Sequence, residues 1–303
     1  MRALLVGLGA WGGLWYEKLI LRDDIELAGA VDSNTQRWKG DNAACRFYTD
    51  AGEAMDELKP DFVLNATPPK VHRQINDLAF DRGIPVLCDK PIAEDHGDAL
   101  HIVSRAANGQ KLMIAENYRY APQSRHIKSC LMQEPPGTIR EIQILFRRRH
   151  HIENYHMSME HPLLMDVGIH HLDMLRYFTG SEAKSVYAEF RTPPGSWYSG
   201  YSNAELRITM ENGVKVTYSG SLDAGANETG WYGRWGFTGE NGVLTFEPDD
   251  GEANAGGDAV LGSFLDYIRN GTLPETHISD NFKTYGMARA ALCSFQKRKE
   301  ITL

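Results

Sequence analysis

A glycine-rich turn near the start of the chain constrains the fold more than any other feature. Six consecutive residues fit the pattern G-x-G-x-x-G: Gly7, Leu8, Gly9, Ala10, Trp11 and Gly12. An apolar run over residues 2–6 precedes the turn, and a helical pattern over residues 15–21 follows it. This context is typical of a strand–turn–helix unit that binds a dinucleotide, with the pyrophosphate at the amino end of the helix. We therefore expect these six residues to contact a dinucleotide cofactor.

An acidic residue follows the second expected strand, residues 26–31. Asp32 stands about twenty residues beyond the glycines, where a carboxylate accepts the ribose hydroxyls of NAD and repels the 2′-phosphate of NADP. Ser33 beside it is uncharged, whereas Arg37 is placed to reach a phosphate. We predict NAD, with NADP not excluded. The alternative interpretation of Asp32 is an acid that caps the next turn.

The first part of the chain alternates short apolar runs with helical patterns. The expected strands cover residues 2–6, 26–31, 61–66, 85–88 and 111–115, and helices are expected over 71–82 and 95–108. Nearly continuous apolar strands separated by helices indicate a parallel sheet that is covered on both faces. We predict an α/β protein whose residues 1–118 form a doubly wound Rossmann domain.

The pattern changes after residue 118. Segments of alternating polarity are separated by turn signals such as Glu211-Asn212-Gly213, and helices are expected over 122–132, 162–178, 259–269 and 281–298. Such a pattern predicts a large, mainly antiparallel open sheet with helices on one side. We expect residues 119–303 to form this second, α+β domain, which binds substrate and forms oligomer contacts.

Composition narrows the possible partners. The 303 residues suffice for two domains, and the net charge of −8 argues against a nucleic-acid partner. No stretch reaches the roughly 20 apolar residues of a membrane helix, so no membrane partner is expected. The four cysteines are scattered, and the first expected strand begins at residue 2 or 3, which leaves no room for a signal peptide. We expect a cytoplasmic protein.

Asp89, Lys90 and Pro91 follow the expected strand over residues 85–88. A lysine at the carboxyl end of a parallel strand lies where open α/β sheets bind their ligands. Lys90 is therefore a candidate functional residue. The alternative is an ordinary surface lysine in a turn.

Asp166 and His170 interrupt the otherwise apolar helical pattern over residues 162–178. Burial of both side chains would lower the stability of the fold by roughly several kcal/mol unless they are paired or take part in chemistry. Four residues apart on an α-helix, they would share a face, and a histidine beside a carboxylate suits a general base. A purely structural Asp–His pair fits the pattern equally well.

Several histidines gather between residues 150 and 171. Their spacing does not match a metal-binding motif such as H-E-x-x-H, so we expect no metal site. We expect some of them to line a polar substrate pocket, formed by four candidate residues: Asn154, Tyr155, His156 and His161.

These motifs, in this order, resemble those of the glucose–fructose oxidoreductase / inositol dehydrogenase / rhizopine-catabolism (Gfo/Idh/MocA) family. The matching residues are Gly7–Gly12, Asp32, Ala66-Thr67-Pro68-Pro69 with His72, Asp89-Lys90-Pro91, Glu116-Asn117-Tyr118-Arg119-Tyr120 and Asp166-Val167-Gly168-Ile169-His170. The resemblance covers nearly the whole chain. Asp89 stands where the family usually has glutamate.

The resemblance implies an NAD(P)-dependent dehydrogenase that transfers hydride between nicotinamide and a secondary alcohol of a sugar, cyclitol or related polyol. It implies that Lys90 reaches the nicotinamide ribose and the substrate hydroxyl, that His170 is the acid–base residue, and that Asp166 holds substrate or orients the pair. The cofactor cleft would be lined by Thr67, Pro68, His72, Asp89 and Lys90. Asn117 and Arg119 are candidate substrate-binding residues.

The resemblance further implies a homodimer or homotetramer formed through the C-terminal sheet. Two alternative functions exist on the same fold: a glycosidase that uses NAD for transient oxidation, and a non-catalytic NAD-binding regulator or sensor. Retention of Lys90, Asp166 and His170 weighs against the regulator or sensor, because cofactor binding alone requires none of them. Net sugar oxidation with free exchange of NADH would argue against the glycosidase.

Overall fold

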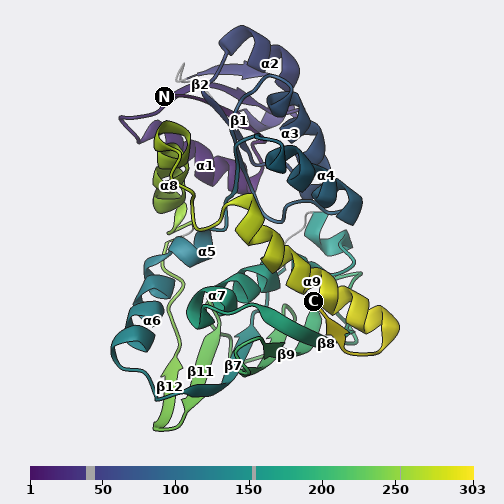
Figure 1. Cartoon of the computed structure of the whole chain (residues 1–303). Helices are drawn as coiled ribbons and strands as arrows, with labels where there is room; N and C mark the ends of the chain where they lie inside the picture. The colour runs from purple at the N-terminus through teal and green to yellow at the C-terminus, as the bar shows by residue number, and fades with distance from the viewer. Residues whose placement is uncertain (39–44, 152–154, 253) are drawn as a thin grey trace. The chain divides into compact units, whose positions relative to one another are not determined.

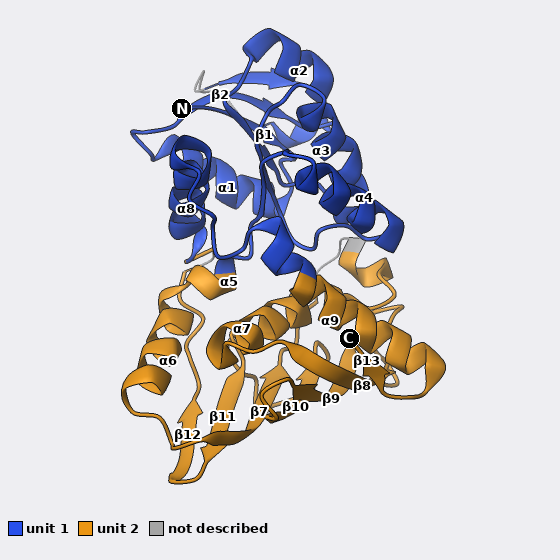
Figure 2. Cartoon of the chain, viewed as in Figure 1, with its two compact units in different colours: residues 1–117, 256–282 blue, residues 118–255, 283–303 orange. Residues whose placement is uncertain are grey.

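The computed structural model describes residues 1–38, 45–151, 155–252 and 254–303 (Figure 1). Its contacts divide it into two compact units (Figure 2). Unit 1 comprises residues 1–117 and 256–282, and unit 2 comprises residues 118–255 and 283–303. Residues 256–282 therefore lie with the N-terminal unit, and not with the C-terminal part where the sequence pattern placed them.

Unit 1 is built on a six-stranded parallel sheet with the order β3-β2-β1-β4-β5-β6. The strands are β1 (Arg2–Val6), β2 (Glu26–Val31), β3 (Arg46–Tyr48), β4 (Phe62–Asn65), β5 (Val86–Cys88) and β6 (Leu112–Ile114). This strand order is that of a Rossmann fold, which confirms the expected doubly wound sheet. Short β3 was not expected from the sequence.

Helices cover both faces of this sheet (Figure 1). Figure 1 shows α1 and α8 on one face and α2, α3 and α4 on the other. Their bounds are α1 (Ala10–Ile20), α2 (Ala51–Leu58), α3 (His72–Phe80), α4 (His96–Ala107) and α8 (Gly257–Asn270). Asp50 and Asp95 cap α2 and α4 by accepting hydrogen bonds from backbone amides of their first turns, which explains where these helices begin.

Packing explains why α8 belongs to unit 1. The Phe264 ring of α8 is fully buried and meets the Phe62 ring of β4 edge-on, with centroids 5.5 Å apart. Lys18 of α1 forms an ion pair with Asp258 of α8 at 2.7 Å. Sequence order could not reveal this placement, because in the chain α8 lies between residues 139–246 and 301–302, which form the strands of the second sheet.

Unit 2 is built on a seven-stranded sheet with the order β12-β11-β7-β10-β9-β8-β13. The strands are β7 (Ile139–Arg147), β8 (Ala183–Arg191), β9 (Asn203–Met210), β10 (Lys215–Ser221), β11 (Arg234–Gly239), β12 (Gly242–Phe246) and β13 (Ile301–Thr302). Strands β7 and β10 pair in parallel, and the other neighbours are antiparallel. The expected mainly antiparallel sheet is confirmed.

One face of this sheet packs against helices. Phe178 of α7 (Ile169–Thr179) meets Trp235 and Phe237 of β11, with centroids 5.0 and 6.0 Å apart. Phe295 of α9 (Ile278–Lys297) meets Phe190 of β8 at 5.2 Å. Helices α5 (Asn117–Tyr120) and α6 (Pro122–Gln133) precede the sheet in the chain.

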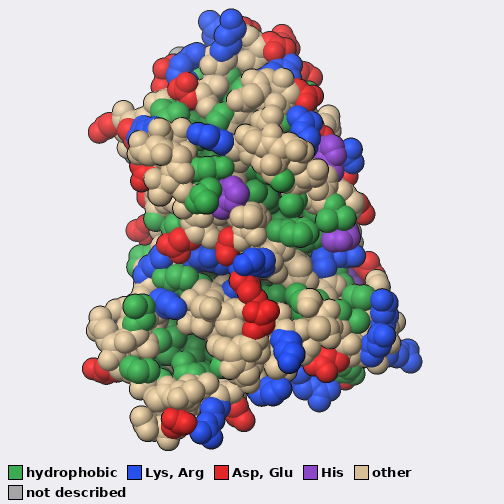
Figure 3. Space-filling model, in the orientation of Figure 1, with side chains coloured by type: hydrophobic (Ala, Val, Ile, Leu, Met, Phe, Trp, Pro, Cys, Tyr) green, Lys and Arg blue, Asp and Glu red, His purple; other side chains and the backbone are tan. Residues whose placement is uncertain are grey.

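Among the helices of the described residues, none is long and apolar enough to cross a membrane. Acidic and basic side chains are interspersed over the face of the molecule that Figure 3 shows.

Gly12 offers a test of the packing between α1 and β1. A Cβ at Gly12 would lie 2.0 Å from the Gly7 carbonyl oxygen, whereas a Cβ at Gly13 meets nothing within 4 Å. We expect Gly12→Ala to lower the free energy of unfolding by about 2 kcal/mol or more. Gly13→Ala, in the same helix, is the matched control and should raise it by up to about 1 kcal/mol. Urea unfolding measures both, and equal losses would contradict this account.

Candidate functional site

The glycine turn lies at the carboxyl end of β1. Gly7 has a φ of +98°, which favours glycine, and its N–H donates to the Val31 carbonyl at 2.8 Å. Gly9 is the N-cap of α1, no side chain caps this helix, and a Cβ at Gly9 would meet only open space. Among the described residues no side chain caps the N–H groups of the first turn, and the backbone is open to close approach. These residues fit a pyrophosphate.

Asp32 directly follows β2 and is buried, with 5% of its surface exposed. Its Oδ2 accepts the Leu8 N–H at 2.7 Å, and its Oδ1 accepts the Asn34 N–H at 2.8 Å. The exposed Arg37 side chain approaches Oδ2 to 3.2 Å through Nη1. The carboxylate therefore caps the following turn and also fixes the glycine turn. Since a carboxylate offers about four lone-pair sites, acceptance of ribose hydroxyls is compatible with these bonds.

The loops after β4 and β5 reach the same edge of the sheet, because all six strands run parallel. Thr67 donates its hydroxyl hydrogen to Asn65 Oδ1 at 2.6 Å, and Pro68 next to it is half-buried. Lys90 is 9% exposed, and its backbone N–H donates to Asp89 Oδ1 at 2.9 Å. The sheet topology thus gathers the predicted cofactor residues of unit 1 at one edge.

His72 differs from its neighbours in being fully buried, with 0% of its surface exposed. Both ring nitrogens face backbone carbonyls of the two loops, those of Thr67 and Pro91. The sequence placed His72 among the residues that line the cofactor cleft. The structure places it beneath the loops instead.

Asp166 lies in a π-helical turn, Leu163–Gly168, that runs directly into α7. The Ile169 N–H donates to the Leu164 carbonyl five residues back, so the expected continuous α-helix over 162–178 is wrong at this end. The wider turn changes the angular relation between Asp166 and His170 from the one that α-helical spacing predicts. π-helical turns occur frequently at functional sites.

Two histidines lie near the Asp166 carboxylate. His156 Nε2 is 3.4 Å from Asp166 Oδ1, and both side chains are largely buried. Burial lowers the pKa of His150, and the negative charge of Asp166 opposes this shift. Tyr198 donates its hydroxyl hydrogen to the His150 carbonyl at 2.5 Å, and burial raises its pKa to about 12. The structure therefore brings together Asp166 and His156, two of the predicted site residues.

His170 is 2% exposed and stacks on the ring of Tyr118, with centroids 4.0 Å apart and an interplanar angle of 7°. His171 packs elsewhere: its Nδ1 is 3.2 Å from the Tyr218 hydroxyl and its Nε2 is 2.9 Å from the Trp231 carbonyl. Neighbouring histidines on α7 thus have different surroundings, which suits a functional role for His170 and a structural one for His171.

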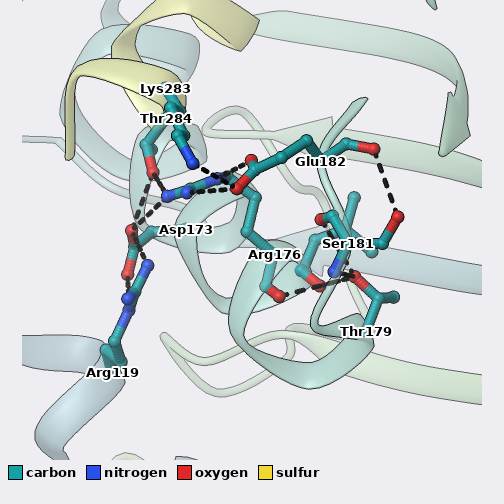
Figure 4. A network of polar contacts seen from close by, with 9 residues as sticks. Arg119, Asp173, Arg176, Thr179, Ser181, Glu182, Lys283 and Thr284 are labelled. Carbon is teal, nitrogen blue, oxygen red and sulfur yellow. Dashed lines mark hydrogen bonds and ion pairs between the residues drawn. The ribbon is translucent and has the colours of Figure 1, made fainter. Parts of the chain in front are cut away.

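Arg119 is part of a buried polar network in unit 2 (Figure 4). Its guanidinium binds both carboxylate oxygens of Asp173, at 2.8 and 2.6 Å, and Asp173 is 0% exposed. Thr284 donates to the same carboxylate at 2.7 Å, and Arg176 donates to Thr284 at 2.8 Å. Because the Arg119 guanidinium is bound to Asp173, the network gives Arg119 a structural role that the sequence did not suggest.

The other candidate substrate residues are placed differently. His161 is 7% exposed and packs against the rings of Phe190, Tyr201 and Phe295, with centroids 4.8, 5.0 and 6.2 Å away. Asn117 is buried. Asn154 lies outside the described residues, as does the side chain of Tyr155. Within the described ranges, no three His, Cys, Asp or Glu side chains are grouped as metal ligands.

Sequence reasoning missed several residues around these sites. Asn65 and Asn76 are fully buried and bonded to each other at 2.9 Å, and polar residues inside an apolar strand and helix were the available signal. Tyr118 was noted only as part of a motif, because stacking on a residue 52 positions away leaves no local pattern. Asn281 is 1% exposed, and neither side-chain polar atom has a hydrogen-bond partner among the described residues.

Two models of known protein families match this chain, one over its N-terminal part and one over its C-terminal part. Residues 1–118 match the model described as "Oxidoreductase family, NAD-binding Rossmann fold". Residues 124–245 match the model described as "GFO/IDH/MocA C-terminal domain". The chain belongs to the Gfo/Idh/MocA family. It is therefore an NAD-binding oxidoreductase, as the glycine turn and Asp32 predicted.

Characterised Gfo/Idh/MocA relatives are distant in sequence. D-apiose dehydrogenase of Paraburkholderia graminis is 26% identical, over 93% of this chain and 84% of its own length. Inositol 2-dehydrogenase of Corynebacterium glutamicum is 26% identical over 71% of this chain, and the match spans 65% of that relative, just under two thirds. The crystal structure of GenD2 from gentamicin A biosynthesis in complex with NAD has a TM-score of 0.89 at 20% identity, covering 100% of this chain and 96% of that one. That structural likeness shows the shared fold.

Loss of Arg119 tests the buried network. We expect Arg119→Ala to lower the free energy of unfolding by about 3–5 kcal/mol, because it leaves a buried carboxylate without its main cation. Arg140→Ala, which removes an exposed ion pair with Glu240, is the control and should cost less than about 1 kcal/mol. Chemical denaturation measures both. Similar small losses would show that Asp173 does not need Arg119 as its cationic partner.

The buried His171 predicts a pH dependence of stability. Burial lowers the pKa of His171 to about 3, and the charge of His170 adds to this shift while the Trp231 carbonyl opposes it. In the unfolded chain the pKa of a histidine is about 6.5. Between these two pKa values the unfolded chain therefore binds more protons than the folded protein. Stability is then lost as the pH falls through this window, by up to about 1.4 kcal/mol per pH unit from this group.

His171→Gln removes this titration. The slope of unfolding free energy against pH between about pH 4.5 and 6 should therefore be smaller in the variant by up to the same amount. Urea unfolding across this range measures the slope. Equal slopes in the two proteins would contradict the assignment.

Proposed function

We propose that this protein is an NAD-dependent dehydrogenase that oxidises a secondary alcohol of a sugar, cyclitol or related polyol, or reduces the corresponding carbonyl. The observation that carries the proposal is that the residues needed for this reaction are divided between the two units. Unit 1 carries the dinucleotide-binding turn and Lys90, and unit 2 carries Asp166 and His170 on one buried helical segment. The two distant relatives named above act on apiose and inositol, both rich in hydroxyl groups.

Each side chain has a role in this reaction. Lys90 donates a hydrogen bond to the reacting oxygen and stabilises negative charge that develops there. His170 accepts the hydroxyl proton as the carbonyl forms, and it returns the proton in the reverse direction. Bound NAD supplies the acceptor for the hydride that leaves the carbinol carbon. The proton and the electron pair of the alcohol thus have separate destinations.

The surroundings of His170 and Asp166 support these roles. The Tyr118 ring holds the His170 imidazole in one orientation, and its face attracts the positive charge that His170 gains with the proton. Asp166, paired with His156, offers a carboxylate and an imidazole as hydrogen-bond partners for further substrate hydroxyls. The buried setting limits competition from water.

Asp32 favours NAD over NADP, because it presents a carboxylate where the 2′-phosphate would lie. Arg37 Nη1 lies 3.2 Å from that carboxylate, which partly neutralises the positive charge of Arg37 and makes it a weaker partner for a phosphate. We therefore propose NAD as the preferred cofactor, with NADP as a poorer one.

Two further expectations stay predictions. The first is a homodimer or homotetramer that forms through the C-terminal sheet, where alternate residues of β9 and β10 are exposed. The second is a cytoplasmic location.

A dehydrogenase screen tests the proposal. The protein is assayed with NAD and NADP separately against sugars, cyclitols and sugar acids, by the absorbance of the reduced nicotinamide. We expect NAD reduction with one class of polyol, and a fall in kcat/KM of about 10²- to 10⁴-fold in Lys90→Ala. Lys297→Ala, which removes an exposed lysine at the end of α9, is the control and should leave turnover unchanged.

Other outcomes would favour the alternatives. Hydrolysis of a glycoside without accumulation of NADH would indicate the NAD-dependent glycosidase. Binding of NAD without turnover across the panel would indicate the regulator or sensor. Full activity of Lys90→Ala on every accepted substrate would refute the role of Lys90.

A further inference from the structure

His72 occupies an unusual position between two loops of unit 1. It is the first residue of α3 and is fully buried. Its Nε2 is 2.8 Å from the carbonyl oxygen of Thr67, in the loop after β4. Its Nδ1 is 2.9 Å from the carbonyl oxygen of Pro91 and 3.3 Å from that of Ile92, in the loop after β5. A single ring thus contacts the backbone of both loops.

Hydrogen bonds attach the backbone of His72 firmly to the sheet. Asn65, the last residue of β4, donates through Nδ2 to the His72 carbonyl at 3.3 Å and to Asn76 Oδ1 at 2.9 Å. Both asparagines are 0% exposed, so these bonds are shielded from water. The start of α3 is therefore a fixed point from which the imidazole extends to the two loops.

The shape of an imidazole suits this position. Its two nitrogens lie on different sides of a rigid ring and reach two carbonyls at once, whereas an amide presents its polar atoms at one end. Burial lowers the pKa of His72, the carbonyl contacts partly oppose this, and the charge of Lys90 adds to it. A ring nitrogen that carries a hydrogen donates to the carbonyl oxygen it faces, so the neutral ring donates to one loop and the protonated ring donates to both.

The loop after β5 carries Lys90 immediately before Pro91. A movement of the Pro91 carbonyl therefore moves the backbone from which the Lys90 side chain extends. A displacement of about 1 Å at a reacting group is enough to slow a reaction about 10²-fold. Support of this loop is thus a functional requirement if Lys90 acts as proposed above.

We propose that His72 is a positioning residue that holds the Lys90 loop (residues 89–93) at a fixed distance from the Thr67 loop (residues 66–68). It does not contact the cofactor itself. This inference rests on the proposed function for its catalytic consequence only. Its structural part, the restraint of residues 89–93 by the ring, holds whatever reaction the protein performs.

Three variants test the proposal. His72→Phe keeps a flat ring and removes both nitrogens, and His72→Gln keeps one donor. Phe80→Leu is the matched control, because Phe80 is buried at the other end of α3 and lies outside both loops. Amide hydrogen exchange of the free protein, followed by mass spectrometry, reports on peptides that cover residues 66–71 and 86–93.

We expect exchange in residues 89–93 to rise about tenfold or more in His72→Phe over Phe80→Leu, compared at equal loss of global stability, with His72→Gln between them. In the active enzyme, kcat and kcat/KM should fall together, by about 10- to 100-fold in His72→Phe, because Lys90 acts in the transition state. Phe80→Leu should retain kcat.

Equal exchange of residues 89–93 in His72→Phe and Phe80→Leu would overturn the proposal and leave His72 as a residue of general stability. Exchange is measured without cofactor or substrate, so its result does not depend on whether the proposed dehydrogenase reaction occurs. If His72→Phe does not fold, the comparison of His72→Gln with Phe80→Leu decides by the same criterion.

Discussion

The close approach of α1 to β1 is the contact on which the rest of unit 1 depends. Gly12 lies so near the Gly7 carbonyl that a Cβ there would be 2.0 Å from its oxygen. This contact sets the amino end of α1 at the carboxyl edge of the parallel sheet. The same edge receives Asp32 from β2, the Thr67 loop from β4 and the Lys90 loop from β5. One backbone contact and one strand direction thus assemble the cofactor side of the site.

Buried polar groups connect the elements of that edge. The Asp32 carboxylate joins the glycine turn to the end of β2, and His72 lies between the loops after β4 and β5. In a medium of low dielectric constant such bonds are strong, and an unpaired partner is costly. The arrangement therefore resists small displacements of these loops, which the proposed hydride transfer would not tolerate.

The polar residues of α7 divide into those bound in buried structural networks and His170, the residue proposed to act as acid and base. Asp173 and Arg176 belong to the buried network with Arg119 and Thr284, and His171 bonds to Tyr218 and the Trp231 carbonyl. His170 instead stacks on Tyr118, and the π-helical turn before it carries Asp166 toward His156. Burial alone does not separate the four α7 residues, since Asp173, Arg176, His170 and His171 are all nearly inaccessible. Their partners do.

The sequence by itself determined the Rossmann unit, the mainly antiparallel second sheet and the family, and it predicted cofactor residues near Gly7 and Asp32. These depend on local features: strand and helix periodicity, glycines in a turn, and an acid at a strand end. Only the tertiary structure decided that α8 packs in unit 1, that Asp166 lies in a π-helical turn, that Arg119 binds Asp173 and that His72 lies beneath the loops. Each of these depends on contacts between residues far apart in the chain or on a hydrogen-bond pattern that tertiary packing selects, and neither leaves a periodic signal in the sequence.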